Sequence, residues 1–98
     1  MLFAIRFTDK PSMLEIRQRY LPAHINWLDE RQETILVAGS LREKIDVNPI
    51  GALWIVEADD ETQAESVFQS DPFWLHGLRA GYEILYWSKA FLHRKVEI

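Results

Sequence analysis

The stretch Leu2-Phe3-Ala4-Ile5-Arg6-Phe7-Thr8 has a large apolar residue at every second position from Phe3 onward. Phe3, Ile5 and Phe7 share one face of an extended chain, and Ala4, Arg6 and Thr8 share the other, because successive side chains of a strand point to opposite sides. A period of two is typical of a half-buried strand. We therefore expect the chain to begin with such a strand, from which the rest of the fold follows.

A helical segment follows this strand. Ser12-Met13-Leu14-Glu15 has the form of a capping box and predicts a short helix that runs to about Arg19. Pro22 disfavours helical geometry at the residue before it, yet suits the first position of a new helix. We expect a break near Tyr20 and a second helix that carries His24 in its first turn.

The remaining segments complete an alternation of strands and helices. Ile35 to Leu41 is a second strand, and Gly51 to Ala58 reads as a strand that is covered on both faces. Asp60 and Gln63 predict a capped helix up to Gln69, and Tyr82 to Phe91 is the last strand. This order predicts an α+β fold of the ferredoxin-like βαββαβ type, with a four-stranded antiparallel sheet and both helices on one face.

Composition limits the organisation and the partners. The chain has 98 residues, of which 48% are hydrophobic, with four Trp and five Phe, and this suits one domain over residues 1–98. So many aromatic residues in a small domain indicate that a partner subunit covers part of the surface, and we expect a homodimer. A formal charge of −4 disfavours nucleic acid. No apolar run is long enough to cross a membrane, and with no cysteine and no signal peptide we expect a cytoplasmic protein.

His24 and Asp71 are the candidate catalytic residues. In the expected topology the start of the second helical piece, the end of the later helix and the exit of the second strand lie at one end of the sheet, so His24, Asp71 and Gly39-Ser40 converge. A base with an orienting acid is sufficient for acid/base catalysis. Two structural readings stay open: Asp71 before Pro72 is a good helix cap, and a single histidine is more often a boundary residue than a catalytic one.

Two electrostatic influences act on His24 in this arrangement. The positive end of a helix favours the neutral imidazole, while an adjacent carboxylate favours the imidazolium. The balance would let His24 accept and give a proton near neutral pH.

Other residues are candidates for binding the substrate. Arg17 and Arg19 could hold an anionic or phenolate oxygen, although exposed helix arginines are commonly just solvated. Ser40 lacks the surroundings of a nucleophile and is assigned at most a hydrogen bond to substrate. Trp54 and Trp74 could be pocket walls, but aromatic residues of a small domain are first of all core or interface.

The sequence contains no recognisable motif for binding a metal ion or a coenzyme. His76 and His93 form no helix-spaced pair with His24 or with each other, and no acidic cluster has metal-ligand spacing. The four glycines make no phosphate-binding motif. We therefore expect neither a metal ion nor a cofactor.

The motifs together resemble those of the YCII-related family. They are the run Arg19 to His24 with its Pro-Ala-His ending, Val37-Ala38-Gly39, Pro49-Ile50-Gly51-Ala52 and Asp71-Pro72-Phe73. The resemblance covers almost the whole chain and implies a ferredoxin-like domain that dimerises through its sheets into an α+β barrel. It also implies an active pair, matched here by His24 and Asp71. Members often have proline after Ala-Gly, where this chain has Ser40.

The same resemblance suggests an activity. Some members of this size act on chlorinated aromatic compounds without a cofactor, as dehydrochlorinases or chloromuconolactone dehalogenases. His24 would then remove a proton from a hydroxylated ring or lactone carbon, chloride would leave, and Asp71 would stabilise the imidazolium. The alternatives are a non-catalytic small-molecule binding dimer and a cofactor-free relative of the antibiotic-biosynthesis monooxygenases.

Overall fold

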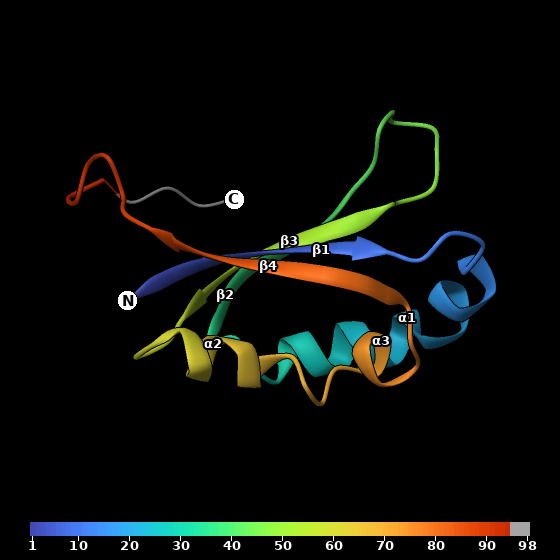
Figure 1. Cartoon of the computed structure of the whole chain (residues 1–98), viewed down its shortest axis with the longest axis horizontal. Helices are drawn as coiled ribbons and strands as arrows, with labels where there is room; N and C mark the ends of the chain where they lie inside the picture. Colours follow the sequence, from blue (N-terminus) through green and yellow to red (C-terminus); the bar gives the residue numbers. More distant parts are fainter. Residues whose placement is uncertain (95–98) are drawn as a thin grey trace.

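The computed structural model describes residues 1–94 and contains seven elements. Three helices lie together beneath one face of the sheet (Figure 1). In chain order the elements are β1 (Leu2–Asp9), α1 (Leu14–Asp29), β2 (Ile35–Leu41), β3 (Gly51–Glu57), α2 (Glu61–Val67), α3 (Pro72–Leu75) and β4 (Arg79–Trp87).

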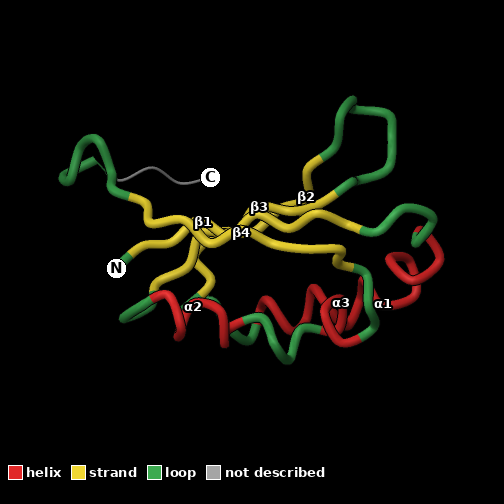
Figure 2. The backbone as a smooth tube through the Cα atoms, in the orientation of Figure 1, coloured by secondary structure: helices red, strands yellow, loops and turns green. Residues whose placement is uncertain are grey.

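The four strands form one sheet in the order β2-β3-β1-β4, and every neighbouring pair is antiparallel. β1 and β2 therefore run in one direction, and β3 and β4 run in the other. With the helices on one face, this is the ferredoxin-like α+β fold expected from the element order (Figure 2).

The core lies between the inner sheet face and the helices. The alternation of β1 places Phe3, Ile5 and Phe7 on this face, and all three are buried. Their partners across the strand pair are Val56, Trp54 and Ala52, which are buried too. From the helices the core receives Trp27, Ala64 and Phe68.

The outer sheet face has no helix over it. Leu53 of β3 is 41% exposed and Leu85 of β4 is 54% exposed. On this outer face of β3, Leu53 is exposed while Ile55 is buried at 8% exposure, so the chain itself covers the second face of β3 only in part. The connection between β2 and β3, residues 42–50, and the segment after β4 both rise on this outer side (Figure 1).

The first helix differs from the expectation in two ways. It is continuous from Leu14 to Asp29 and contains Pro22, so the predicted break near Tyr20 is wrong. The predicted capping box is wrong as well, because Met13 is the N-cap and makes no side-chain cap, while Ser12 has a φ of 60°. His24 consequently lies in the second half of a long helix, and the first-turn macrodipole argument does not apply to it.

The last strand also differs. β4 spans Arg79–Trp87, several residues earlier than the predicted Tyr82 to Phe91. At the start of β3, Gly51 permits a close backbone approach, because an added Cβ there would come within 2.0 Å of the Phe7 carbonyl oxygen.

Within the described residues no helix has the length and apolar character to span a membrane. The cytoplasmic location stays a prediction.

The cap of α2 is the one that the sequence predicted, and it provides a test of the fold. The Asp60 carboxylate accepts from Gln63 N–H at 2.8 Å. Asp60→Ala should lower the free energy of unfolding by about 1 kcal/mol, because the first turn of α2 loses its side-chain acceptor. That corresponds to a melting temperature about 4–8 °C lower for a domain of this size. Neighbouring Asp59→Ala is the matched control, since its side chain makes no described hydrogen bond; equal melting temperatures of the two variants would contradict the prediction.

Candidate active site

The side chains of His24 and Asp71 meet in the interior. His24 Nδ1 and Asp71 Oδ1 are 2.7 Å apart, although 47 residues separate them along the chain. His24 is 6% exposed and Asp71 is fully buried. An ionised carboxylate can only accept a hydrogen bond. Nδ1 of His24 therefore carries the proton and donates a hydrogen bond to Asp71 Oδ1, which leaves Nε2 as an acceptor. The pair therefore has the polarity of a base held by an orienting acid.

One oxygen of Asp71 makes both contacts that its sequence position suggested. Oδ1 accepts from His24 and also from Phe73 N–H at 3.0 Å, which caps α3. The cap and the partner of His24 are thus not alternatives. Oδ2 is buried and has no hydrogen-bond partner within residues 1–94.

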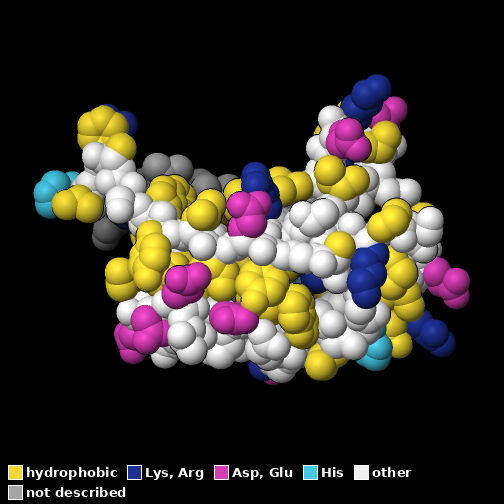
Figure 3. Space-filling model, in the orientation of Figure 1, with side chains coloured by type: hydrophobic (Ala, Val, Ile, Leu, Met, Phe, Trp, Pro, Cys, Tyr) yellow, Lys and Arg dark blue, Asp and Glu magenta, His cyan; other side chains and the backbone are white. Residues whose placement is uncertain are grey.

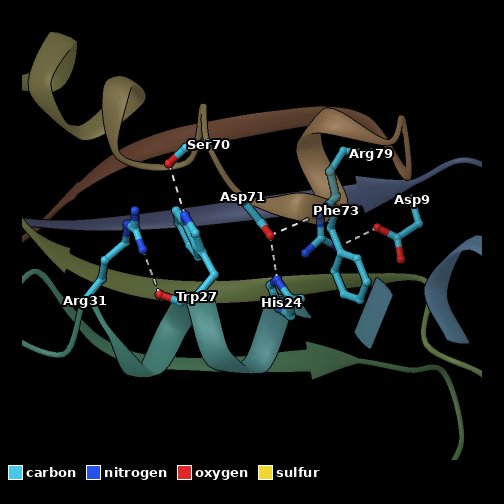
Figure 4. A network of polar contacts seen from close by, with 8 residues as sticks. All are labelled: Asp9, His24, Trp27, Arg31, Ser70, Asp71, Phe73 and Arg79. Carbon is cyan, nitrogen blue, oxygen red and sulfur yellow. Dashed lines mark hydrogen bonds and ion pairs between the residues drawn. The ribbon is translucent and has the colours of Figure 1, made fainter. Parts of the chain in front are cut away.

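A second contact holds the segment that carries Asp71. Trp27, one turn after His24 on α1, donates from Nε1 to Ser70 Oγ at 3.0 Å (Figure 4). Neighbouring residues on the helix surface are three or four apart, so His24 and Trp27 face the same way. Two consecutive residues, Ser70 and Asp71, are therefore fixed by two positions of one helix face.

A cavity of about 330 Å³ opens beside His24. Buried side chains of the sheet and of α3 form its inner wall, namely Ala52, Trp54, Phe73 and Arg79. The His24 ring stacks on Phe73 with 4.0 Å between ring centroids and an interplanar angle of 16°. Exposed residues form the mouth, including Leu21, Ile25, Ser40, Arg42 and Asn48. This volume is at the lower end of the range for small-molecule sites, about 300–1,000 Å³, and suits a single ring.

A cluster of three charged residues lies beside Phe73. The Asp9 carboxylate accepts from Arg79 Nη1 at 2.7 Å through one oxygen and from Arg17 Nη2 through the other. Both guanidiniums lie 5.3 Å from the centre of the Phe73 ring. Burial lowers the pKa of Arg79, while its hydrogen bond to Asp9 and the charges of Asp9 and Asp71 raise it.

The structure places the predicted binding residues in two groups. Arg17, Ser40 and Trp54 line the cavity. Arg19 is exposed, with its guanidinium over Tyr20, and Trp74 packs against Phe68 and Tyr82. Neither residue is among those that line the cavity, and a role of either in binding substrate stays a prediction.

Sequence reasoning missed Asp9 and Arg79. The alternation of Phe3, Ile5 and Phe7 continues to position 9 and would have placed Asp9 on the buried face. Arg79 had no comparable signal. A register shift between Thr8 and Asp9 pairs Asp9 with Arg79 after Thr8 has paired with Gly81, and this irregularity turns Arg79 inward.

The fold and the site define a small α+β protein with a buried histidine-carboxylate pair at a cavity. A family model, the YCII-related domain, matches residues 1–88. The chain belongs to the YCII-related family, as the motifs suggested.

Solved structures give a more specific likeness. The chain is similar to the 5-chloro-2-hydroxyhydroquinone dehydrochlorinase of Burkholderia phenoliruptrix AC1100, solved in complex with 2,5-dihydroxybenzoquinone, with 29% identity, a TM-score of 0.80, and coverage of 90% of this chain and 94% of that one. A putative antibiotic biosynthesis monooxygenase from Bacteroides thetaiotaomicron VPI-5482 matches at 22% identity and a TM-score of 0.59, over 99% of this chain and 95% of that one. This second likeness shows the fold alone. No curated protein matches the chain.

The double contact of Asp71 leads to a test. Asp71→Ala removes the acceptor of both Phe73 N–H and His24, and should cost about 1–3 kcal/mol of unfolding free energy because buried donors lose their partner. Asp71→Asn keeps an oxygen for Phe73 N–H and should be more stable than Asp71→Ala. Thermal denaturation of the two variants compares them; equal losses would show that Asp71 does not act as a cap.

Proposed function

We propose that this protein is a cofactor-independent lyase that eliminates hydrogen chloride from a small hydroxylated and chlorinated ring. His24 is the general base and Asp71 orients it. The observation that carries the proposal is the 2.7 Å contact between His24 Nδ1 and Asp71 Oδ1 at the wall of a ring-sized cavity. Likeness to a dehydrochlorinase over nine-tenths of the chain supports the substrate class.

The residues support proton transfer at a fixed place. Because Nδ1 is engaged by Asp71, Nε2 is the nitrogen left to take a proton from a bound substrate. Stacking on Phe73 holds the plane of the ring. The indole of Trp54 gives the substrate ring an apolar wall. Asp71 stabilises the imidazolium that forms when His24 is protonated.

The reaction balances with His24 as the sole proton carrier. On a chlorinated trihydroxybenzene, His24 takes a hydroxyl proton and returns it to the carbon that bears chlorine, which gives a keto tautomer with a tetrahedral C–Cl carbon. His24 then takes a proton from a second hydroxyl. The electron pair of that O–H bond forms a second C=O, the ring double bond shifts, and the C–Cl bond breaks with its electron pair on chloride. The products are a hydroxybenzoquinone, chloride and one proton that leaves through His24.

Removal of the base tests the function. His24→Gln should lower the rate of chloride release from 5-chloro-2-hydroxyhydroquinone by about 10²–10⁴-fold, the usual contribution of general acid/base catalysis. Initial rates of halide release under anaerobic conditions are the measurement. His76→Gln is the matched control, because His76 is exposed and lines no part of the cavity, and it should retain the wild-type rate.

The same assay separates the competing functions. Chloride release without oxygen supports elimination, whereas turnover that requires oxygen would support a monooxygenase-like reaction. Binding of the quinone product without any turnover would support a non-catalytic binding protein. Unchanged activity of His24→Gln would remove His24 from the mechanism.

We also propose that a second copy of the chain covers the outer sheet face and completes a dimeric α+β barrel. The sheet register groups apolar side chains on this face around Ala4, which lies opposite Ile55 on one side and Leu85 on the other. Leu53 and Trp87 extend the group. Figure 3 shows hydrophobic side chains on the two projections that flank the sheet and, between them, hydrophobic side chains beside one basic and one acidic side chain; Arg6 and Glu83 form an exposed ion pair on this face. An apolar sheet face needs a covering layer, and the same patch on a second copy is self-complementary about a two-fold axis.

A lysine in this patch should separate the copies. Leu85→Lys places a charge where the two faces meet and should convert a dimer to a monomer in size-exclusion chromatography with light scattering. Leu75→Lys is the control, because Leu75 is 65% exposed on α3, in the helical layer. A dimer that persists in Leu85→Lys would place the interface elsewhere.

A further inference from the structure

Two buried polar atoms near the cavity have no hydrogen-bond partner within residues 1–94, namely Asp71 Oδ2 and Arg79 Nε. One belongs to an anion and the other to a cation. Both side chains are almost inaccessible, at 1% exposure each. Burial of an ionised carboxylate is costly unless an opposite charge compensates it, so the charges around Asp71 decide whether it can stay ionised.

The charged groups around the pair come from four elements. β1 contributes Asp9, α1 contributes Arg17 and His24, the start of α3 contributes Asp71, and β4 contributes Arg79. Arg42, which follows β2, lies at the exposed mouth, where solvent screens its charge. β3 presents only apolar side chains to the cavity, Ala52 and Trp54.

The positive and negative charges of this group do not cancel in the cluster of Asp9 with its two arginines. Two guanidiniums share the single carboxylate of Asp9, so the Arg17–Asp9–Arg79 cluster carries one surplus positive charge. The His24–Asp71 pair carries one negative charge when His24 is neutral, and none when His24 is protonated. The surplus charge therefore stabilises the form of the pair in which His24 is ready to act as a base.

We propose that Arg79 is a positioning residue of the site, and that the Arg17–Asp9–Arg79 cluster keeps Asp71 ionised and thereby sets the pH at which His24 loses its proton. The inference deepens the proposed function, on which its importance for catalysis rests. Arg79 acts through the charge of Asp71, which it compensates at the inner wall of the cavity; Figure 4 draws its side chain beside Asp71. The electrostatic effect is mutual, because the charge of Asp71 raises the pKa of Arg79.

The test is a titration of His24 by NMR, which needs no substrate. The Cε1–H resonance of His24 is followed through the pH range of imidazole titration in the labelled protein, with His76 and His93 as internal references. Arg79→Met removes the surplus positive charge with little change of shape. The titration midpoint of His24 should then rise, because the negatively charged form of the pair loses its compensation.

A second variant changes the charge in the opposite direction. Asp9→Asn keeps oxygen and nitrogen near the arginines but leaves two positive charges without a carboxylate, so the midpoint should fall. Opposite shifts distinguish electrostatics from structural damage, which would move both variants in the same direction. This arm also decides the question if Arg79→Met does not fold.

Matched controls complete the design. Arg79→Lys retains the charge and should restore a midpoint near that of the wild type. Arg19→Met removes the same charge from an exposed site of α1 and should leave the midpoint unchanged. An unchanged midpoint in Arg79→Met, or shifts of equal sign in Arg79→Met and Asp9→Asn, would overturn the inference. Absence of chloride release from the wild-type protein would instead count against the proposed function, and would leave this titration valid.

Discussion

The contact of Asp71 Oδ1 with both His24 and Phe73 N–H is the constraint on which the site depends. It joins the middle of the molecule's long helix to the start of a helix of one turn. A helix of four residues has little stability of its own, because nucleation is unfavourable and few bonds follow it. α3 therefore depends on this cap and on its packing against α1. The same oxygen fixes which imidazole nitrogen carries the proton. One atom therefore both caps α3 and orients His24.

Near that contact, aromatic rings lie between the buried charged side chains and the apolar core. Phe73 has His24 stacked against it and two arginines nearby. Arg79 also lies over Phe7, 4.7 Å from the ring centre. Contacts of guanidinium groups with aromatic faces offset part of the cost of burying charge. The carboxylates that pair with these cations offset the remaining cost of burying charge. Ionised groups can therefore persist beside a core built of Phe3, Ile5 and Trp54.

Sequence patterns predicted the elements with strong periodicity, and failed where a local rule competed with packing. β1, β2 and the capped α2 follow from alternation and from the Asp60–Gln63 spacing. Pro22 was expected to break the helix because a proline disfavours helical geometry at the residue before it, and a proline in a helix interior costs about 3 kcal/mol. The helix continues because His24 and Trp27, just beyond the proline, are buried against Asp71 and the sheet. Burial of that face outweighs the local penalty.

The sequence by itself determined the order of strands and helices, the ferredoxin-like class, the resemblance to the family, and that His24 and Asp71 lie at the same end of the sheet. Periodicity and connectivity suffice for these, because each depends on neighbours in the chain or on strand direction alone. Tertiary structure decided that Asp9 joins Arg17 and Arg79, that Arg19 and Trp74 lie outside the cavity, and that Arg79 faces inward. Those outcomes depend on a register shift at one strand pair and on which side of a helix meets the sheet, and a linear pattern does not encode three-dimensional contacts between residues 70 positions apart.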